Sequence, residues 1–105
     1  MINVEYDNSK VSEADIKKLS EAVRDIVSRV TGIEDVFTYT NSAEIKVKIA
    51  PIEVFVRMTK KKIKDEDSLI KQIKEEISKW KKMSAFRHPI NLTLIPMDWK
   101  VEIGI

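Results

Sequence analysis

Few side chains in this sequence have the chemistry of a catalytic or metal site. There is no cysteine, which excludes disulfides, thiolate nucleophiles and thiolate metal sites. His88 is the only histidine, and it lies before Pro89 in a loop-like stretch with no second histidine to share a metal. No phosphate-binding loop, HExxH motif or dinucleotide fingerprint is present. We therefore expect no metal, no cofactor and no Ser-His or Cys-His nucleophile.

Three polar side chains on or beside predicted strands remain, namely Tyr39, Lys48 and Arg57. A phenol can donate a proton, and an ammonium or guanidinium group can hold a carboxylate. Charged residues on strands also protect sheet edges and form ion pairs at interfaces, which is the simpler interpretation. The residues alone leave both interpretations open.

A lysine-rich stretch at residues 60–64, together with Lys46 and Lys48, could contact phosphates. Acidic residues 65–67 follow at once and cancel much of this positive field, and the formal net charge of the chain is only +2. A solvated loop is therefore the preferred interpretation. Nucleic-acid binding through residues 60–64 is kept as an alternative.

These residues are positioned by a sheet, whose clearest strand is residues 51–58. Pro51 occupies its first position, where no ladder amide is needed, and β-branched and aromatic residues fill the rest. Alternation places Ile52, Val54, Val56 and Met58 on a core face. Glu53, Phe55 and Arg57 fall on the opposite face, which suits water or another subunit better than a helix.

Two amphipathic helices accompany the strands. Ser12 and Asp15 form an N-cap pair and Gly32 supplies a stop, which predicts a helix over residues 12–31. The acidic residues 65–67 begin a second helix, which ends near Lys81 and Lys82. Further strands are predicted at residues 2–6, 36–40, 92–97 and 99–105. Residues 44–49 form either a short edge strand or an extended loop.

The order strand, helix, strand occurs twice, so residues 1–105 should form a single α+β domain. Each helical crossover makes its two strands parallel. We predict two β-α-β units in one mixed four-stranded sheet, with both helices on one face and short extra strands. The other face is bare and carries Asn3, Glu5, Phe37, Tyr39, Glu53, Phe55, Arg57 and Thr93. Such faces can pack together around a symmetry axis, where Arg57 could pair with Glu5 or Glu53.

The composition of the chain indicates the cellular environment in which it is expected to work. Hydrophobic residues make up 43% and charged residues 34%, and there is a single glutamine. This composition is typical of a heat-adapted protein. No signal peptide and no apolar run of membrane-spanning length is found. We expect a cytoplasmic protein without membrane association.

Residues 36–39, 51–56 and 94–97, with residues 99–104, resemble a small uncharacterised family of the tautomerase superfamily, which also contains macrophage migration inhibitory factor. The resemblance covers essentially the whole chain. It implies a homotrimer whose sheets surround a central channel, with pockets between neighbouring subunits. The strand at residues 101–103 would then add to a neighbour's sheet edge.

The superfamily's usual catalytic base is an amino-terminal proline, whereas the second residue here is Ile2. A bulky isoleucine should prevent removal of Met1, so we expect Met1 to be the terminus and the proline base to be missing. The Met1 amine, with an ordinary pKa of about 7.7 to 8.0, could still act as a base if a pocket lowered that value.

The resemblance suggests the Met1 amine as a catalytic candidate, and the chemistry of the polar side chains adds Tyr39 and Arg57, which do not match the superfamily's donors residue for residue. Lys48, Phe37 and Trp99 are the candidates for ligand binding. The preferred hypothesis is a homotrimer that binds a small organic acid at the subunit interface. The alternative is a residual keto-enol tautomerase, an isomerase that uses the Met1 amine.

Overall fold

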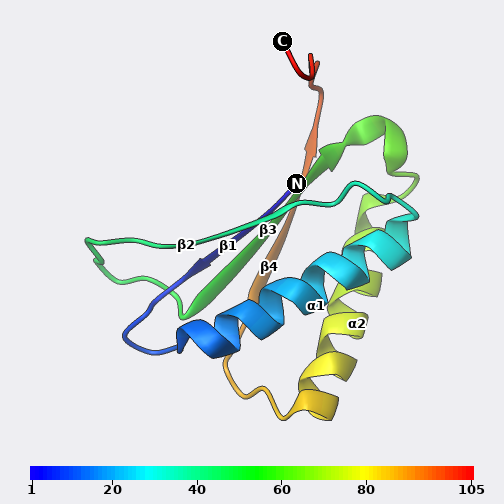
Figure 1. The fold of residues 1–105 in the computed structure, drawn as a ribbon. Helices are drawn as coiled ribbons and strands as arrows, with labels where there is room; N and C mark the ends of the chain where they lie inside the picture. The colour runs from blue at the N-terminus through cyan, green and yellow to red at the C-terminus, as the bar shows by residue number, and fades with distance from the viewer.

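The computed structural model describes all residues from Met1 to Ile105. Its elements follow the predicted order (Figure 1), with bounds β1 Ile2–Tyr6, α1 Glu13–Thr31, β2 Thr38–Ser42, β3 Ile52–Thr59, a 3-10 turn Lys60–Lys62, α2 Glu66–Ser84 and β4 Asn91–Met97. The predicted pair of β-α-β units is confirmed.

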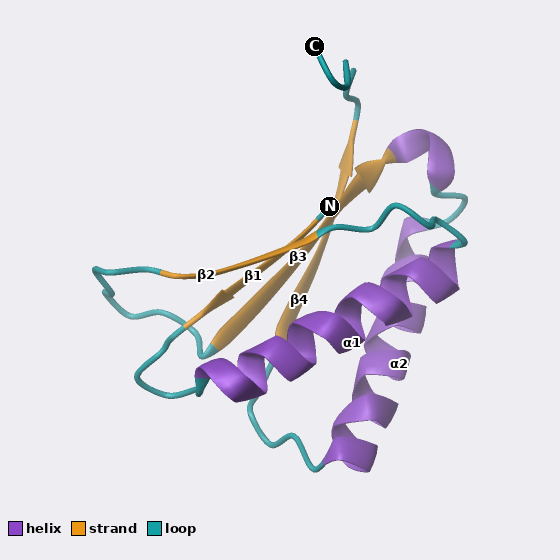
Figure 2. Cartoon of the chain, in the orientation of Figure 1, coloured by secondary structure: helices purple, strands orange, loops and turns teal.

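The four strands form one mixed sheet in the order β2-β1-β3-β4. Strand β1 runs parallel to β2, β3 runs parallel to β4, and the central pair β1 and β3 is antiparallel. Both helices lie on the same side of this sheet, as predicted (Figure 2). The opposite side is not covered by any element of the chain.

The core lies between the sheet and the helices. Along β3, each core-facing residue from Ile52 to Met58 is buried, while the residues between them are half-buried. Helix α1 contributes six buried residues, five of them apolar, whereas α2 contributes only Ile73 and Ile77. The first unit therefore closes the core more completely than the second.

The ends of α1 follow the sequence signals. The Ser12 hydroxyl accepts a hydrogen bond from the Asp15 N–H at 3.1 Å, and Gly32 ends the helix with φ 73°. Asp65 caps α2 by accepting from the Ser68 N–H at 3.0 Å, and Ala85 ends that helix in a left-handed conformation. No helix of the chain combines the length and apolar character needed to cross a membrane.

Three predicted segments differ from the structure. Strand β2 begins at Thr38 rather than residue 36, because its ladder starts opposite Ile2. Residues 43–50 form no strand, which decides between the two interpretations of residues 44–49, and Ile45 is 85% exposed. Residues 98–105 also form no strand, and Ile103 is 89% exposed. Both apolar patterns lack a partner strand within the chain.

Pro96 lies in β4 opposite Met58, and β4 is an edge strand. An edge strand can accept a proline because its outer side needs no ladder hydrogen bonds.

Candidate functional site

The amino group of Met1 is held in a fixed position at the end of the central strand pair. It donates a hydrogen bond to the Arg57 carbonyl oxygen at 2.8 Å. The Arg57 N–H in turn donates to the Met1 carbonyl oxygen at 2.8 Å. These two hydrogen bonds extend the β1–β3 ladder by one residue and fix the amine beside the Arg57 backbone.

This environment lowers the pKa of the Met1 amine below its ordinary value of 8.0. Burial is the larger cause, and the positive charge of Arg57 is the second. Both effects disfavour the ammonium form. A larger fraction of the amine is therefore unprotonated at neutral pH, which is the form that can act as a base.

A pocket of about 150 Å³ adjoins this amine. Its lining is mainly apolar and consists of Met1, Ile2, Val27, Ile33, Val36, Val56, Met58 and Trp99, with Asp35, Arg57, Thr59 and Lys62 as polar members. The pocket thus brings together three predicted site residues, Met1, Arg57 and Trp99. Trp99 comes from the segment that follows β4.

The guanidinium group of Arg57 lies on the bare face of the sheet. It donates to Asn3 Oδ1 and stands 5.6 Å above the centre of the Phe55 ring. Asn3 lies opposite Phe55 in the ladder, which makes it a diagonal neighbour of Arg57. Within the chain, Arg57 forms no ion pair, so the predicted pairing with Glu5 or Glu53 would require a second subunit and stays a prediction.

The other three predicted site residues lie elsewhere. Tyr39 is on the bare face of β2 opposite Asn3 and is 55% exposed. Lys48 is exposed in the loop at residues 43–50 and borders neither the amino-terminal pocket nor the groove described next. Phe37 precedes β2, is 62% exposed and borders that groove.

The lysine-rich stretch at residues 60–64 makes one ion pair within the chain. Lys60, in the 3-10 turn, forms an ion pair of 3.4 Å with Asp98. Lys62 borders the amino-terminal pocket, and all the lysines of residues 60–64 are exposed. No feature of this turn favours nucleic acid over water as its neighbour, so nucleic-acid binding stays an untested alternative.

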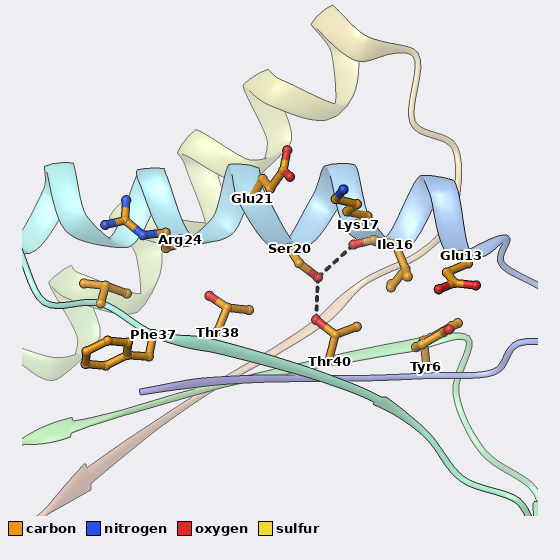
Figure 3. Close-up of a pocket in the computed structure, with 11 residues that line it drawn as sticks. Tyr6, Glu13, Ile16, Lys17, Ser20, Glu21, Arg24, Phe37, Thr38 and Thr40 are labelled. Carbon is orange, nitrogen blue, oxygen red and sulfur yellow. Dashed lines mark hydrogen bonds between the residues drawn. The ribbon is translucent and has the colours of Figure 1, made fainter.

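A larger groove of about 470 Å³ lies between α1 and β2 (Figure 3). The sequence patterns did not predict it. The one feature of the sequence that could have indicated this groove is the pair Thr38 and Thr40. Both are hydroxyl residues on the helix-facing side of a strand, where apolar residues would be expected.

No protein-family model matches the chain, and no curated protein matches it in sequence. Solved structures do match its fold. A malonate semialdehyde decarboxylase aligns with TM-score 0.72 and 13% identity over 100% of this chain and 92% of its own. A fused 4-OT, described as a symmetric trimer, aligns with TM-score 0.65 and 18% identity over 99% and 93%. A domain of unknown function from Sebaldella termitidis aligns with TM-score 0.62 and 10% identity over 100% and 98%.

These alignments cover nearly the full length of this chain and of each matched chain, so the likeness concerns the whole fold and not a shared fragment. Their identities are low, and they therefore establish the fold alone. The chain has the fold of the tautomerase superfamily, as the sequence resemblance predicts.

Proposed function

We propose that this protein is a cytoplasmic homotrimer that binds a small organic acid beside the Met1 amine, where subunits meet. The observation that carries the proposal is an arginine without a carboxylate partner, Arg57, next to an ordered amino group. Together these groups form a cationic corner at the end of the β1–β3 pair, and both residues border the amino-terminal pocket.

The chemistry of Arg57 suits a carboxylate ligand. A guanidinium group has five N–H donors, and the hydrogen bonds of this side chain account for one, which goes to Asn3. Its planar fork can bind a carboxylate through two parallel hydrogen bonds. Trp99, which borders the pocket and is 40% exposed, would hold the apolar part of the same ligand.

The trimer part of the proposal is supported by the uncovered surfaces of the chain. The bare sheet face carries Phe55 and Tyr39, and the segment after β4 exposes Val101, Ile103 and Ile105. Two solved structures with this fold, both fused 4-OT proteins, are described as trimers, one symmetric and one asymmetric. Association would bury these apolar groups and bring a second chain to the edge of the pocket.

Ligand binding is tested by titrating the protein with phenylpyruvate and with its uncharged methyl ester, using calorimetry. We expect the acid to bind and the ester to bind much more weakly. Because a hydrogen bond to a charged group contributes about 1.5–3 kcal/mol, Arg57→Gln should weaken binding by roughly tenfold or more. Arg87→Gln, which changes an exposed loop arginine, is the matched control. Equal binding by wild type and Arg57→Gln would contradict the proposal.

A second function, keto-enol tautomerisation, is favoured by the lowered pKa of the Met1 amine. The neutral amine would take the proton from the enol hydroxyl and become an ammonium group. As the carbonyl forms, the electrons of the C=C bond would take a proton at carbon from that ammonium, which restores the amine. Arg57 would hold the carboxylate during the transfer.

The reaction is measured as the loss of enol absorbance of phenylpyruvate. Acetylation of the amino terminus at mildly acidic pH, where the α-amine of lowered pKa reacts before lysine, should abolish turnover. Intact mass confirms that Met1 is the terminal residue, and circular dichroism confirms that the acetylated protein is folded. Turnover that survives acetylation, or its absence in the unmodified protein, would rule out the Met1 amine as the base.

A further inference from the structure

The end of the sheet that carries the cationic corner has a second hollow, which we call the outer hollow. It has a volume of about 490 Å³ and is lined by Thr59, Lys61, Asp98, Trp99 and Lys100. Thr59 and Trp99 also line the amino-terminal pocket, so the two hollows adjoin. At this end β3 runs into the 3-10 turn, and the segment after β4 leaves the sheet beside it (Figure 1).

The strand registers connect the outer hollow with Arg57 along the bare face of the sheet. Arg57 and Thr59 are two residues apart in β3, so they project from the same face at a separation of roughly 7 Å. Their ladder partners on β4 are Ile95 and Met97, both half-buried. Ile95 and Met97 thus form an apolar strip that leads from Arg57 toward Trp99.

Positive charges outnumber negative charges at this end of the molecule. Lys61 and Lys100 line the outer hollow, and Lys62 lines the amino-terminal pocket. All three are exposed, and none forms an ion pair within the chain. The one acid of the outer hollow, Asp98, is already paired with Lys60 at 3.4 Å.

The acids of the bare face lie at its other end. Glu5 and Glu53 are ladder partners, and Glu53 is separated from Arg57 by four residues of β3, which is roughly 13 Å. The remaining acid near the corner is Asp35, which lines the amino-terminal pocket together with Lys62. An anion that lies along the strip therefore meets more cations than acids.

We propose that the organic acid bound by this protein carries a second anionic group, a dianionic group of the phosphate type, which occupies the outer hollow. This inference rests on the proposed function, because the carboxylate of the same molecule binds Arg57. The apolar body of the ligand lies along the strip and against Trp99. The phosphate group then binds Lys61 and Lys100.

The two ends of the site select different anions. The planar guanidinium fork of Arg57 matches the two oxygens of a carboxylate. A lysine ammonium is a compact point charge with three donors, and it does not require a planar partner. A phosphate group has up to two negative charges and three acceptor oxygens, so one group can engage both lysines of the outer hollow.

The test compares three acids that share a benzene ring and a carboxymethyl group, namely phenylacetate, para-carboxyphenylacetate and para-phosphonophenylacetate. Each is titrated into the full-length protein by calorimetry at mildly alkaline pH, where the phosphonate is dianionic. Exposed ion pairs are individually weak, so two lysines together should make the phosphonate bind about tenfold more tightly than phenylacetate. This gain should shrink with added salt. A dicarboxylate that gains as much as the phosphonate would overturn the assignment to phosphate.

Lys61→Gln combined with Lys100→Gln tests where the second group binds. This double variant should lower the affinity for the phosphonate to about that for phenylacetate. Lys71→Gln combined with Lys74→Gln is the matched control, because it removes the same number of charges from exposed positions of α2. The control should keep the difference between the two acids. Equal loss in both double variants, or no loss in either, would contradict binding in the outer hollow.

The outcomes distinguish this inference from the proposed function. Phenylacetate should bind the wild type and bind Arg57→Gln more weakly, which supports the carboxylate site. If it does so, equal affinities for phenylacetate and the phosphonate would overturn the second group alone. If none of the three acids binds, the carboxylate site is refuted, and this inference fails with it.

Discussion

The two faces of the sheet are made from alternate residues of the same strands, yet they differ sharply in how they are covered. On the helix side, Ile2, Val4 and Ile52 are fully buried. On the bare side, Asn3, Phe55 and Arg57 are only half-buried, and Tyr39 is mostly exposed. The first face is completed within one chain. The second has the mixed aromatic and charged character of a surface that is completed by a partner.

The largest effect on stability should come from the covered face. Ile52→Ala removes a fully buried side chain from the centre of the core. The lost burial and the resulting cavity should lower the free energy of unfolding by about 2–5 kcal/mol, measured by chemical denaturation. The control Met83→Ala, which truncates an 88% exposed side chain on α2, should change it by no more than about 0.5 kcal/mol. A loss below about 1 kcal/mol for Ile52→Ala would mean that this face is not tightly packed.

The bare face should instead control assembly. Phe55→Lys removes the ring beneath Arg57 and places a second positive charge beside it. Since an unpaired charge is costly in an interface, light scattering should show the mass of one chain in place of three, with the circular dichroism spectrum unchanged. Ser78→Lys, on an exposed face of α2, should remain trimeric. A wild-type monomer at micromolar concentration would refute the trimer directly.

The covered face is also the part of the structure that sequence patterns predict well. Alternation along residues 51–58 gives the buried and half-buried faces of β3 residue by residue. Ser12 and Gly32 define the ends of α1, because capping depends on local chemistry within one turn of helix. The parallel pairing of β1 with β2 and of β3 with β4 follows from the crossover rule.

The sequence is less informative where the outcome depends on distant contacts. Residues 98–105 alternate like a strand, but a strand needs a partner edge, and the chain offers none to this segment. The amino-terminal pocket forms because Arg57 and Trp99 meet Met1 in three dimensions. The groove on α1 and β2 depends on hydrogen bonds between residues 20 positions apart, which no local pattern reveals.

A smaller effect should appear in the pH dependence of stability. It comes from the Met1 amine at the end of the β1–β3 pair. The Met1 amine has a lowered pKa in the folded protein, so the unfolded chain binds more protons between that value and 8.0. The free energy of unfolding should therefore rise with pH through this window and level off above 8.0. Acetylation of the amine should remove this part of the slope in denaturation curves. A slope that persists unchanged would assign it to other groups.

The smallest effect concerns the turn that directs the chain from β1 to the covered face. The Asp7 side chain is held there by Ser9, whose hydroxyl and N–H donate to Oδ1 at 2.6 and 3.0 Å. The Ser9 side-chain hydrogen bond is the main cause that lowers the pKa of Asp7 below 3.8, followed by the bond from the Ser9 N–H. Ser9→Ala should therefore raise the pKa of Asp7, although the N–H bond keeps it below its ordinary value. A proton titration followed by NMR measures the shift, with Ser78→Ala as the control.

The stability linked to Asp7 is present above pH 3.8 and is lost as the pH falls through its lowered pKa. In Ser9→Ala the contribution of Asp7 above pH 3.8 should be smaller than in the control, and its loss on acidification should be complete at a higher pH. The Asp7 N–H also donates to the Pro51 carbonyl oxygen at 3.0 Å, which joins the end of β1 to the start of β3. If the substitution also disturbed the amide shifts of Asn3 and Phe55 on the bare face, the turn would be coupled to both sides of the sheet and the two faces could not be treated as independent.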